Sequence, residues 1–261
     1  MNRHVLLPVV FSLAVLAAFP VAASAQQQQL IFLPIVEDSK MPTIDGSWTS
    51  STEWDKASET VHNYTDSTNL VIRAMRDADF VYVLLEMPQD FIVDGHGAIC
   101  FDTLSDGGAY MNPDDVCYVL GETLREYHGD GRTTLMQQAP KNPNVIAERG
   151  LSGSNSPHSS NRDHVTYEFR LAADYIGSER VSYGFYVSFD TVKEGTNFTY
   201  FYSWPETGSP EYLRVASPRS WGVLTASESE IPEFPLPALG ALAGVIGVIA
   251  VATRTRIFKL R

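Results

Sequence analysis

The sequence lacks the short motifs that mark the common enzyme classes. Its 261 residues contain no Gly-x-Ser-x-Gly nucleophile elbow, no His-Glu-x-x-His zinc motif, no P-loop and no glycine-rich dinucleotide fingerprint. Pairs of carboxylates are plentiful, but they stand at irregular spacings in an acidic chain and do not indicate glycoside hydrolysis. The sequence therefore predicts a protein that is not an enzyme.

Cysteine is also scarce. Cys100, in GAICFDT, and Cys117, in DDVCYVLG, are the two cysteines of the chain, and neither has a second Cys or His at metal-ligand spacing. This excludes a Cys-x-x-Cys redox motif and a zinc site of the usual spacing. In an exported protein the pair favours a disulfide, which contributes roughly 3 kcal/mol on the chain-entropy model. Two free buried thiols are the alternative.

Basic residues are few in the body of the chain. All 31 Asp and Glu lie between Gln26 and Glu233, whereas five of the 19 Lys and Arg lie outside this segment. The segment therefore has 14 basic residues and a formal net charge of −17. Such a charge repels nucleic acid and anionic lipid, so the composition excludes a nucleic-acid partner. It suits solubility, cation binding or high salt.

Long apolar runs occur at the two ends of the chain. Residues 1–25 combine Arg3, an apolar run and a small Ala-Ser-Ala exit before Gln26, which is the layout of a secretory signal peptide; a retained anchor is the alternative. Residues 234–253 are uncharged, and the first nineteen of them span about 28 Å as a helix, close to the thickness of a bilayer core. This predicts one transmembrane helix.

The segments around this predicted helix set its orientation. The basic tail 254–261 predicts a cytoplasmic C-terminus, so the domain would lie outside the cell. An acidic stalk, 226–233, precedes the helix, and a polar leader, 26–41, follows the signal peptide. Ile231-Pro232-Glu233-Phe234 resembles the PEF-type C-terminal sorting signals of archaeal surface proteins. The resemblance implies a protein anchored at the cell surface, and cleavage by a sortase-like enzyme stays open.

Residues 42–225 form one predicted domain of β-strands. Runs of β-branched and aromatic residues alternate with Gly, Asp, Asn and Pro, and no long stretch has helical periodicity apart from a turn at Ala172–Ile176. This pattern predicts an all-β fold, an antiparallel β-sandwich of jelly-roll or immunoglobulin-like type. The expected strands are LVIRA (70–74), FVYVLLEM (80–87), GAICFDT (97–103), DDVCYVLG (114–121), RTTLMQQ (132–138), NVIAERG (144–150), HVTYEFRL (164–171), VSYGFYVSFDT (181–191), NFTYFYSW (197–204) and WGVLTA (221–226). Sequons at Asn63 and Asn197 predict glycosylation outside the cell.

Several of these segments occur in the order found in a known family. PTIDGSWTSSTEWDKA (42–57), FVYVLLEM, YEFRLAADYIG followed by YGFYVSFDT, and PRSWG (218–222) resemble carbohydrate-binding module family nine and DOMON-like domains. The resemblance covers 42–224. It implies a sandwich in which Trp54 packs inside near the start and Trp221 closes the far end, and it implies that the domain binds carbohydrate.

A sugar site needs an aromatic face bordered by polar side chains. Tyr200, Tyr202 and Trp204 lie on one face of a predicted strand, and Arg214 could border them. These four residues are the predicted ligand site, and an ordinary aromatic inner face is the alternative. We therefore expect a binding module for an extracellular glycan or envelope component, with a structural envelope protein as a rival.

Acidic residues gather between the two cysteine-bearing segments. Carboxylate, amide and carbonyl oxygens are the ligands that Ca²⁺ prefers, and the resemblance also implies structural calcium. The predicted calcium ligands are Asp102, Asp106, Asn112, Asp114 and Asp115. A solvated acidic loop is the alternative. Some DOMON-like relatives are b-type cytochromes, so a haem carrier is a further alternative, with candidate axial ligands Met75, Met87, His96 and His164. Haem is not expected, because Met after an apolar strand usually fills the core.

Overall fold

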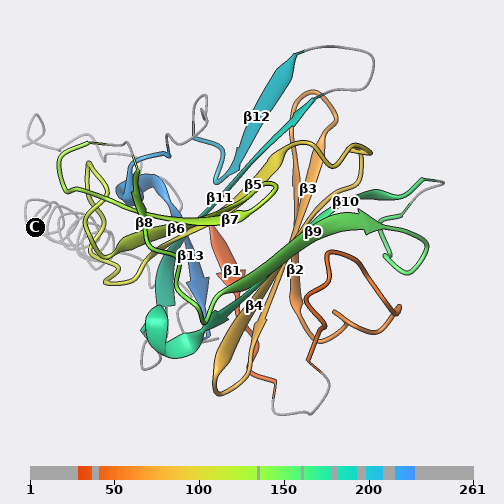
Figure 1. The fold of residues 1–261 in the computed structure, drawn as a ribbon, viewed down its shortest axis with the longest axis horizontal. Helices are drawn as coiled ribbons and strands as arrows, with labels where there is room; N and C mark the ends of the chain where they lie inside the picture. The colour runs from red at the N-terminus through yellow and green to blue at the C-terminus, as the bar shows by residue number, and fades with distance from the viewer. Residues whose placement is uncertain are drawn as a thin grey trace, which may run out of the picture.

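The computed structural model describes residues 29–36, 41–133, 136–159, 162–177, 182–192, 198–207 and 215–226. These residues form thirteen strands and two single 3₁₀ turns (Figure 1). The strands are β1 Leu30–Phe32, β2 Ser58–Asn63, β3 Asn69–Arg76, β4 Phe80–Met87, β5 His96–Asp102, β6 Asp115–Leu120, β7 Leu124–His128, β8 Gln137–Ala139, β9 Ile146–Ser152, β10 His164–Ala172, β11 Ser182–Val192, β12 Thr199–Trp204 and β13 Gly222–Thr225. The 3₁₀ turns are η1 Ala173–Tyr175 and η2 Pro218–Ser220.

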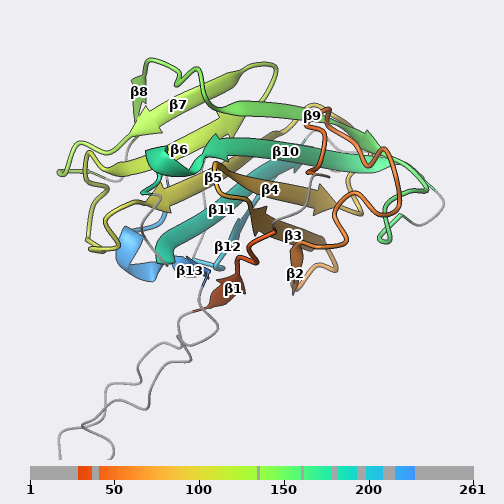
Figure 2. The same ribbon diagram turned by 90° about the horizontal axis from the view of Figure 1, so that it is seen from below.

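The strands form two sheets, which confirms the predicted all-β class. The larger sheet has the order β1-β13-β11-β5-β6-β7-β8, with β12 also paired to β11, and the smaller has the order β2-β3-β4-β10-β9. Figure 2 shows the two sheets from a second direction. Every strand pair in the described part of the chain is antiparallel except β1 with β13.

The main core lies between the sheets because successive side chains of a strand point to opposite faces. On β4, Val83 and Leu85 belong to this core, and on β10 Tyr167 and Phe169 do. The larger sheet contributes aromatic side chains such as Phe185. Each fully buried apolar side chain contributes about 1.5–3 kcal/mol of burial free energy, so this layer dominates the stability of the sandwich.

Both outer faces carry an apolar cluster of their own. Trp48 and Trp54, from the segment before β2, are 3% and 0% exposed and pack with Tyr82 and Leu84 on the outer face of the smaller sheet. Trp221 is 1% exposed and packs on the outer face of the larger sheet. Both of the expected anchors, Trp54 and Trp221, are therefore buried. They cover the backs of the two sheets and do not lie between them, because the core between the sheets is already filled by inward-facing strand residues.

The folded part of the chain begins earlier than the predicted boundary at residue 42. Leu30–Phe32 lies within the predicted leader 26–41, yet it pairs with β13, and Ile35 forms a bridge with Arg76. The expected helical turn is present as η1. Among the described residues no helix is long and apolar enough to cross a membrane. The predicted signal peptide and the predicted membrane helix 234–253 lie outside the described residues.

Candidate functional site

The structure places the predicted aromatic platform mostly inside the fold. β12 pairs with the second half of β11, and its residues Tyr202 and Trp204 belong to the core between the sheets. Trp204 is 2% exposed, contacts Phe185 at 6.0 Å between ring centroids, and lies over Gly222, where a Cβ would come within 2.5 Å of its ring. It therefore has no open face for a sugar. Tyr200 is half-buried against the same core, and Arg214 lies outside the described residues.

Tyr202 differs from Trp204 because its hydroxyl reaches the end of the sandwich. The ring stacks on Phe189 at 4.8 Å, and the hydroxyl donates to Asp66 Oδ2 at 2.7 Å and lies 3.1 Å from Thr68 Oγ1. Both partners belong to the β2–β3 turn, where Asp66 Oδ1 also accepts from the Thr68 backbone N–H at 3.0 Å. This network holds the turn against β12 and forms one wall of a pocket.

This pocket, which we call the rim pocket, has a volume of about 220 Å³ and takes its walls from four separate parts of the chain. Polar and apolar groups both face it: Asp66, Thr68, Gln89, Asp90, Phe91 and Tyr202. Asp90 is 7% exposed, and burial raises the pKa of its carboxyl, with a hydrogen bond from Thr191 acting in the opposite direction. The arrangement can hold a small molecule that offers both hydroxyl groups and an apolar face.

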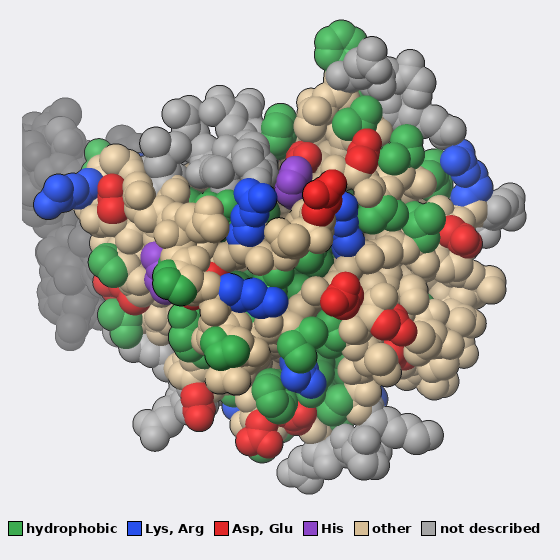
Figure 3. Space-filling view, in the orientation of Figure 1, with side chains coloured by type: hydrophobic (Ala, Val, Ile, Leu, Met, Phe, Trp, Pro, Cys, Tyr) green, Lys and Arg blue, Asp and Glu red, His purple; other side chains and the backbone are tan. Residues whose placement is uncertain are grey.

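A second pocket lies on the other side of the β4–β5 loop. We call it the arginine pocket; its volume is about 340 Å³ and its charged lining residues are Asp94, His96, Glu122, Arg125 and Arg149. Phe91 and Ile92 of the loop line the rim pocket, whereas Val93 and Asp94 line the arginine pocket. Figure 3 shows basic, acidic and His side chains close together on the β7 and β9 side of the molecule.

The structure brings the predicted calcium ligands together at the β5–β6 connection. Asp102 ends β5, Asp115 begins β6, and the two are paired in register. Oxygen atoms of Asp102, Asp106 and Asp114 lie within 4.8 Å of one another. Asn112 donates through Nδ2 to Asp106 Oδ1 at 3.4 Å and through its backbone N–H to Asp115 Oδ2 at 2.5 Å.

Charge accumulates in this acidic cluster. The pKa of Asp115 is raised to about 7. Burial is the largest cause, and the neighbouring carboxylates of Asp102, Asp114 and Asp106 add to it. Burial also raises the pKa of Asp114. Asp115 is fully buried, and its Oδ1 has no hydrogen-bond partner within the described part of the chain. A buried carboxylate oxygen of this kind is costly unless a proton or a cation satisfies it, so the residues fit a hard divalent cation.

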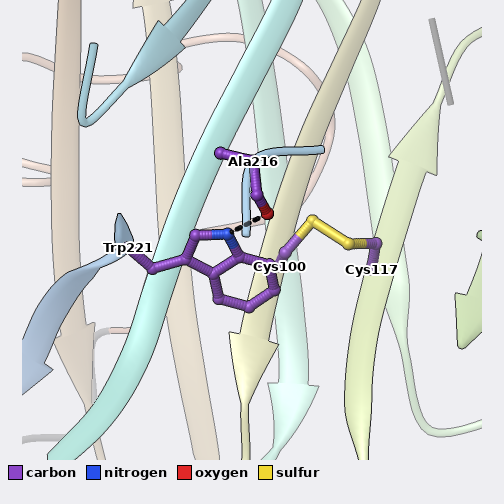
Figure 4. Close-up of a disulfide and its surroundings, with 4 residues drawn as sticks. All are labelled: Cys100, Cys117, Ala216 and Trp221. Atoms are coloured by element: carbon purple, nitrogen blue, oxygen red, sulfur yellow. Dashed lines mark hydrogen bonds between the residues drawn. A yellow bond between two sulfur atoms is a disulfide. The ribbon is translucent and has the colours of Figure 1, made fainter. Parts of the chain in front are cut away.

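The predicted disulfide is confirmed. Cys100 and Cys117 are directly opposite each other on β5 and β6 and are joined (Figure 4). The Trp221 indole lies beside them and donates through Nε1 to the Ala216 carbonyl at 2.8 Å (Figure 4). The bridge and Trp221 thus belong to one cluster on the outer face of the larger sheet.

The candidate haem ligands occupy separate surroundings. Met87 packs in the core between the sheets, whereas Met75 packs with Trp48 and Trp54 on an outer face. His164 is fully buried and its Nε2 lies 2.9 Å from Glu86 Oε1, and His96 contacts Asp190. Of the sequons, Asn63 is exposed at the end of β2, and Asn197 lies outside the described residues.

One buried polar network was not predicted. Glu168 on β10 accepts hydrogen bonds from the backbone N–H groups of Asp45 and Gly46 at 2.9 and 2.8 Å and from Trp54 Nε1 at 3.2 Å. Gly46 has φ of +85°, and a Cβ there would lie 2.5 Å from the Arg149 carbonyl carbon. The Asp-Gly turn is therefore required for the segment before β2 to dock on the sheet. The single acidic residue within the apolar strand HVTYEFRL is the sequence signal for this network, but its partners lie more than 110 residues earlier in the chain.

Comparisons with known proteins give distant similarities only. No protein-family model matches the chain, and no curated protein matches it. Among solved structures, the chain is similar to a carbohydrate binding module family 9 from Caldicellulosiruptor kristjanssonii in complex with cellotriose, with 16% identity and a TM-score of 0.48, covering 79% of this chain and 98% of that chain. A structure with the same description in complex with glucose has 14% identity and a TM-score of 0.46, covering 78% and 100%.

Proposed function

We propose that this chain is a non-catalytic glycan-binding module and that the rim pocket holds a sugar unit. The observation that carries the proposal is the lining of this pocket, where Tyr202, Asp66 and Gln89 meet the half-buried ring of Phe91. The Arg162 guanidinium covers one face of this ring, 3.9 Å from its centroid, so the sugar would pack on the remaining part of the ring. Carboxylate and amide groups are planar hydrogen-bonding partners for hydroxyls, and an aromatic ring packs against the apolar face of a pyranose. A neutral, polyhydroxylated ligand also suits a strongly acidic protein, because it is not repelled.

The proposal includes display at the cell surface. The predicted signal peptide at 1–25, the membrane helix at 234–253 and the basic tail would place the sandwich outside the cell on a C-terminal anchor. A glycan or another envelope component would then be the accessible partner. Glycans at Asn63 and Asn197 belong to the same proposal.

Exchange of Asp66 for asparagine is expected to weaken glycan binding about tenfold or more. Hydrogen bonds to a charged group contribute about 1.5–3 kcal/mol, and 1.4 kcal/mol is a factor of ten in the dissociation constant. Asp66 is exposed, and asparagine keeps one of the two oxygens that accept from Tyr202 and Thr68, so the melting temperature of the variant is measured beside its affinity to separate a shift of the turn from loss of a sugar contact. The measurement is a glycan array followed by calorimetric titration of the best ligand.

The matched control is Asp79→Asn, an exposed aspartate in the β3–β4 turn that lines neither pocket. It removes the same charge and should bind as the parent protein does. Trp204→Ala does not test the site, since its loss leaves a cavity in the core. A parent protein that folds but binds no glycan on the array would remove the proposal.

We also propose a structural calcium ion at the acidic cluster. Asp102, Asp106 and Asp114 would supply carboxylate ligands, Asn112 a side-chain oxygen, and Asp115 its unsatisfied Oδ1. The ion would neutralise part of the charge that raises the pKa of Asp115 and would fix the connection between β5 and β6.

Calcium is expected to raise the melting temperature, and EDTA to lower it. At a calcium concentration one hundred times the dissociation constant, binding stabilises the folded state by about 2.7 kcal/mol. Because the ligands must be deprotonated and the pKa of Asp115 is about 7, calcium affinity should rise with pH through 7, so the shift is larger at pH 8 than at pH 6. Differential scanning calorimetry measures it. Asp106→Ala should lose the shift and Asp79→Asn should keep it; a parent protein that is indifferent to EDTA contradicts the site.

A further inference from the structure

We propose that the arginine pocket binds the carboxylate of an acidic sugar, so that the recognised glycan contains hexuronic acid. This inference rests on the proposed glycan-binding function and names the class of ligand. It follows from one half-buried basic side chain that lines this pocket and forms no ion pair within the described part of the chain.

Arg149 is that side chain. It lies on β9, on the same strand face as Ala147 of the core, and it is half-buried at the edge of the smaller sheet. Its guanidinium donates to the Gly95 carbonyl at 2.5 Å. No carboxylate of the described part of the chain lies within 4.0 Å of it, the distance that defines an ion pair.

Two other arginines of the same sheet have a partner within the fold, and the guanidinium of Arg170 on β10 lies 4.6 Å from the centroid of the Phe80 ring. Arg73 on β3 is 8% exposed, and its guanidinium forms an ion pair with Glu59 on the neighbouring strand. A buried charge is costly unless it is paired. Arg149 instead faces a pocket, and an anionic ligand group would complete its coordination there. A guanidinium binds a carboxylate through two parallel hydrogen bonds, which gives both affinity and orientation.

His96 forms a second wall of the pocket and is held from two sides. Its Nδ1 lies 3.1 Å from Asp190 Oδ1, and because a carboxylate only accepts, the neutral ring carries its proton on Nδ1. The Cδ2–Nε2 edge packs against Gly121, where a Cβ would come within 2.5 Å of Cδ2. The imidazole is therefore held in a fixed orientation as part of the pocket wall.

The other charges of the pocket lie nearer to solvent. Asp94, Glu122 and Arg125 are exposed at the mouth, whereas Arg149 is deeper. Exposed charges are screened by water and salt, so the mouth contributes less to the binding energy than the half-buried guanidinium. In a body with a formal charge of −17, an anion binds only where such a local cation offsets the general repulsion.

The two pockets adjoin, which links the acidic group to the glycan. Ile92 lines the rim pocket and the next residue, Val93, lines the arginine pocket. Asp190, which holds His96, is likewise between the rim-pocket residues Phe189 and Thr191 on β11. The proposal places a polysaccharide across the β4–β5 loop, with one unit in the rim pocket and the carboxylate of another at Arg149.

The test is a titration of the full chain, in neutral detergent at low salt, with two matched pairs of probes. Glucuronate is compared with glucose and galacturonate with galactose; the members of each pair differ at C6 alone, where carboxylate replaces hydroxymethyl. At least one uronate should bind about tenfold or more tightly than its neutral partner, as expected for a charge-assisted bidentate contact. Binding can be followed by ligand-observed NMR and calorimetry.

Arg149→Gln should abolish the preference for the uronate, and Arg149→Lys should restore part of the preference. Arg132→Gln changes an exposed arginine outside both pockets, makes the same change of net charge and should keep the preference.

Neutral sugars that bind as tightly as uronates, or a preference unchanged in Arg149→Gln, would overturn the inference without contradicting the proposed glycan-binding module. Acetate that displaces the uronate with equal affinity would show a general carboxylate site and also overturn it. If no sugar binds, both proposals fall.

Discussion

Exchange of Trp54 for alanine is expected to lower the free energy of unfolding by about 3–5 kcal/mol. The indole is fully buried, packs with Trp48 and Leu84 on the back of the smaller sheet, and donates a hydrogen bond to Glu168. Its removal leaves a cavity, and the buried carboxyl group of Glu168 loses one of its three N–H donors. Because about 1 kcal/mol shifts the melting temperature of a domain this size by 2–4 °C, the melting temperature should fall by roughly 10 °C.

The same variant separates packing from binding. Trp54 lines neither pocket, so glycan affinity measured well below the melting temperature should equal that of the parent protein. Trp54→Phe should lose less stability, because most of the cavity stays filled. Phe198→Ala, which changes an aromatic side chain that is 71% exposed, should shift stability by less than about 0.5 kcal/mol. A Trp54→Ala protein as stable as its parent would show that the segment before β2 does not depend on this anchor.

Loss of the Cys100–Cys117 disulfide is expected to cost about 3 kcal/mol, because the bridge closes a loop across a sequence separation of 17 residues and so restricts the unfolded chain. The melting temperature should fall by roughly 6–12 °C. Thermal unfolding with and without reductant measures the effect in the parent protein. Cys100→Ala/Cys117→Ala is the control: it should melt as the reduced protein does and should not respond to reductant. A parent protein that is equally stable in reductant would contradict the expected contribution.

The strands that sequence patterns predicted well are those with strong apolar content. FVYVLLEM forms β4 over its full predicted length, and HVTYEFRL forms β10 with one further residue. β2 was missed because SETVHN is polar and half-exposed, as suits an edge strand. β1 was missed because its three residues follow a polar leader, and its conformation depends on pairing with β13. Pairing of this kind is set by the rest of the fold and leaves little trace in local composition.

Features of the site were predictable where they are local in the chain. The disulfide joins β5 to β6 and the acidic cluster lies at the connection between these two strands, so both are made by residues close together in the sequence. The rim pocket is lined by residues of the β2–β3 turn, the β4–β5 loop, β11 and β12. It could not be predicted from the pattern of any one of these segments. The alternation of side chains along a β-strand correctly placed Tyr202 and Trp204 on the same face. It could not show that this face looks inward, which depends on the opposite sheet.

The parallel pair of β1 and β13 has a consequence for biogenesis. Leu30 lies opposite Val223, on the order of 190 residues later, and among the described strands β13 is the ladder partner of β1. Closing so long a loop costs entropy that is recovered when the last strand arrives. During synthesis, β1 can therefore form its ladder only after nearly all of the described domain has been made, and a chaperone that shields the edge of β1 until then would favour correct folding over aggregation.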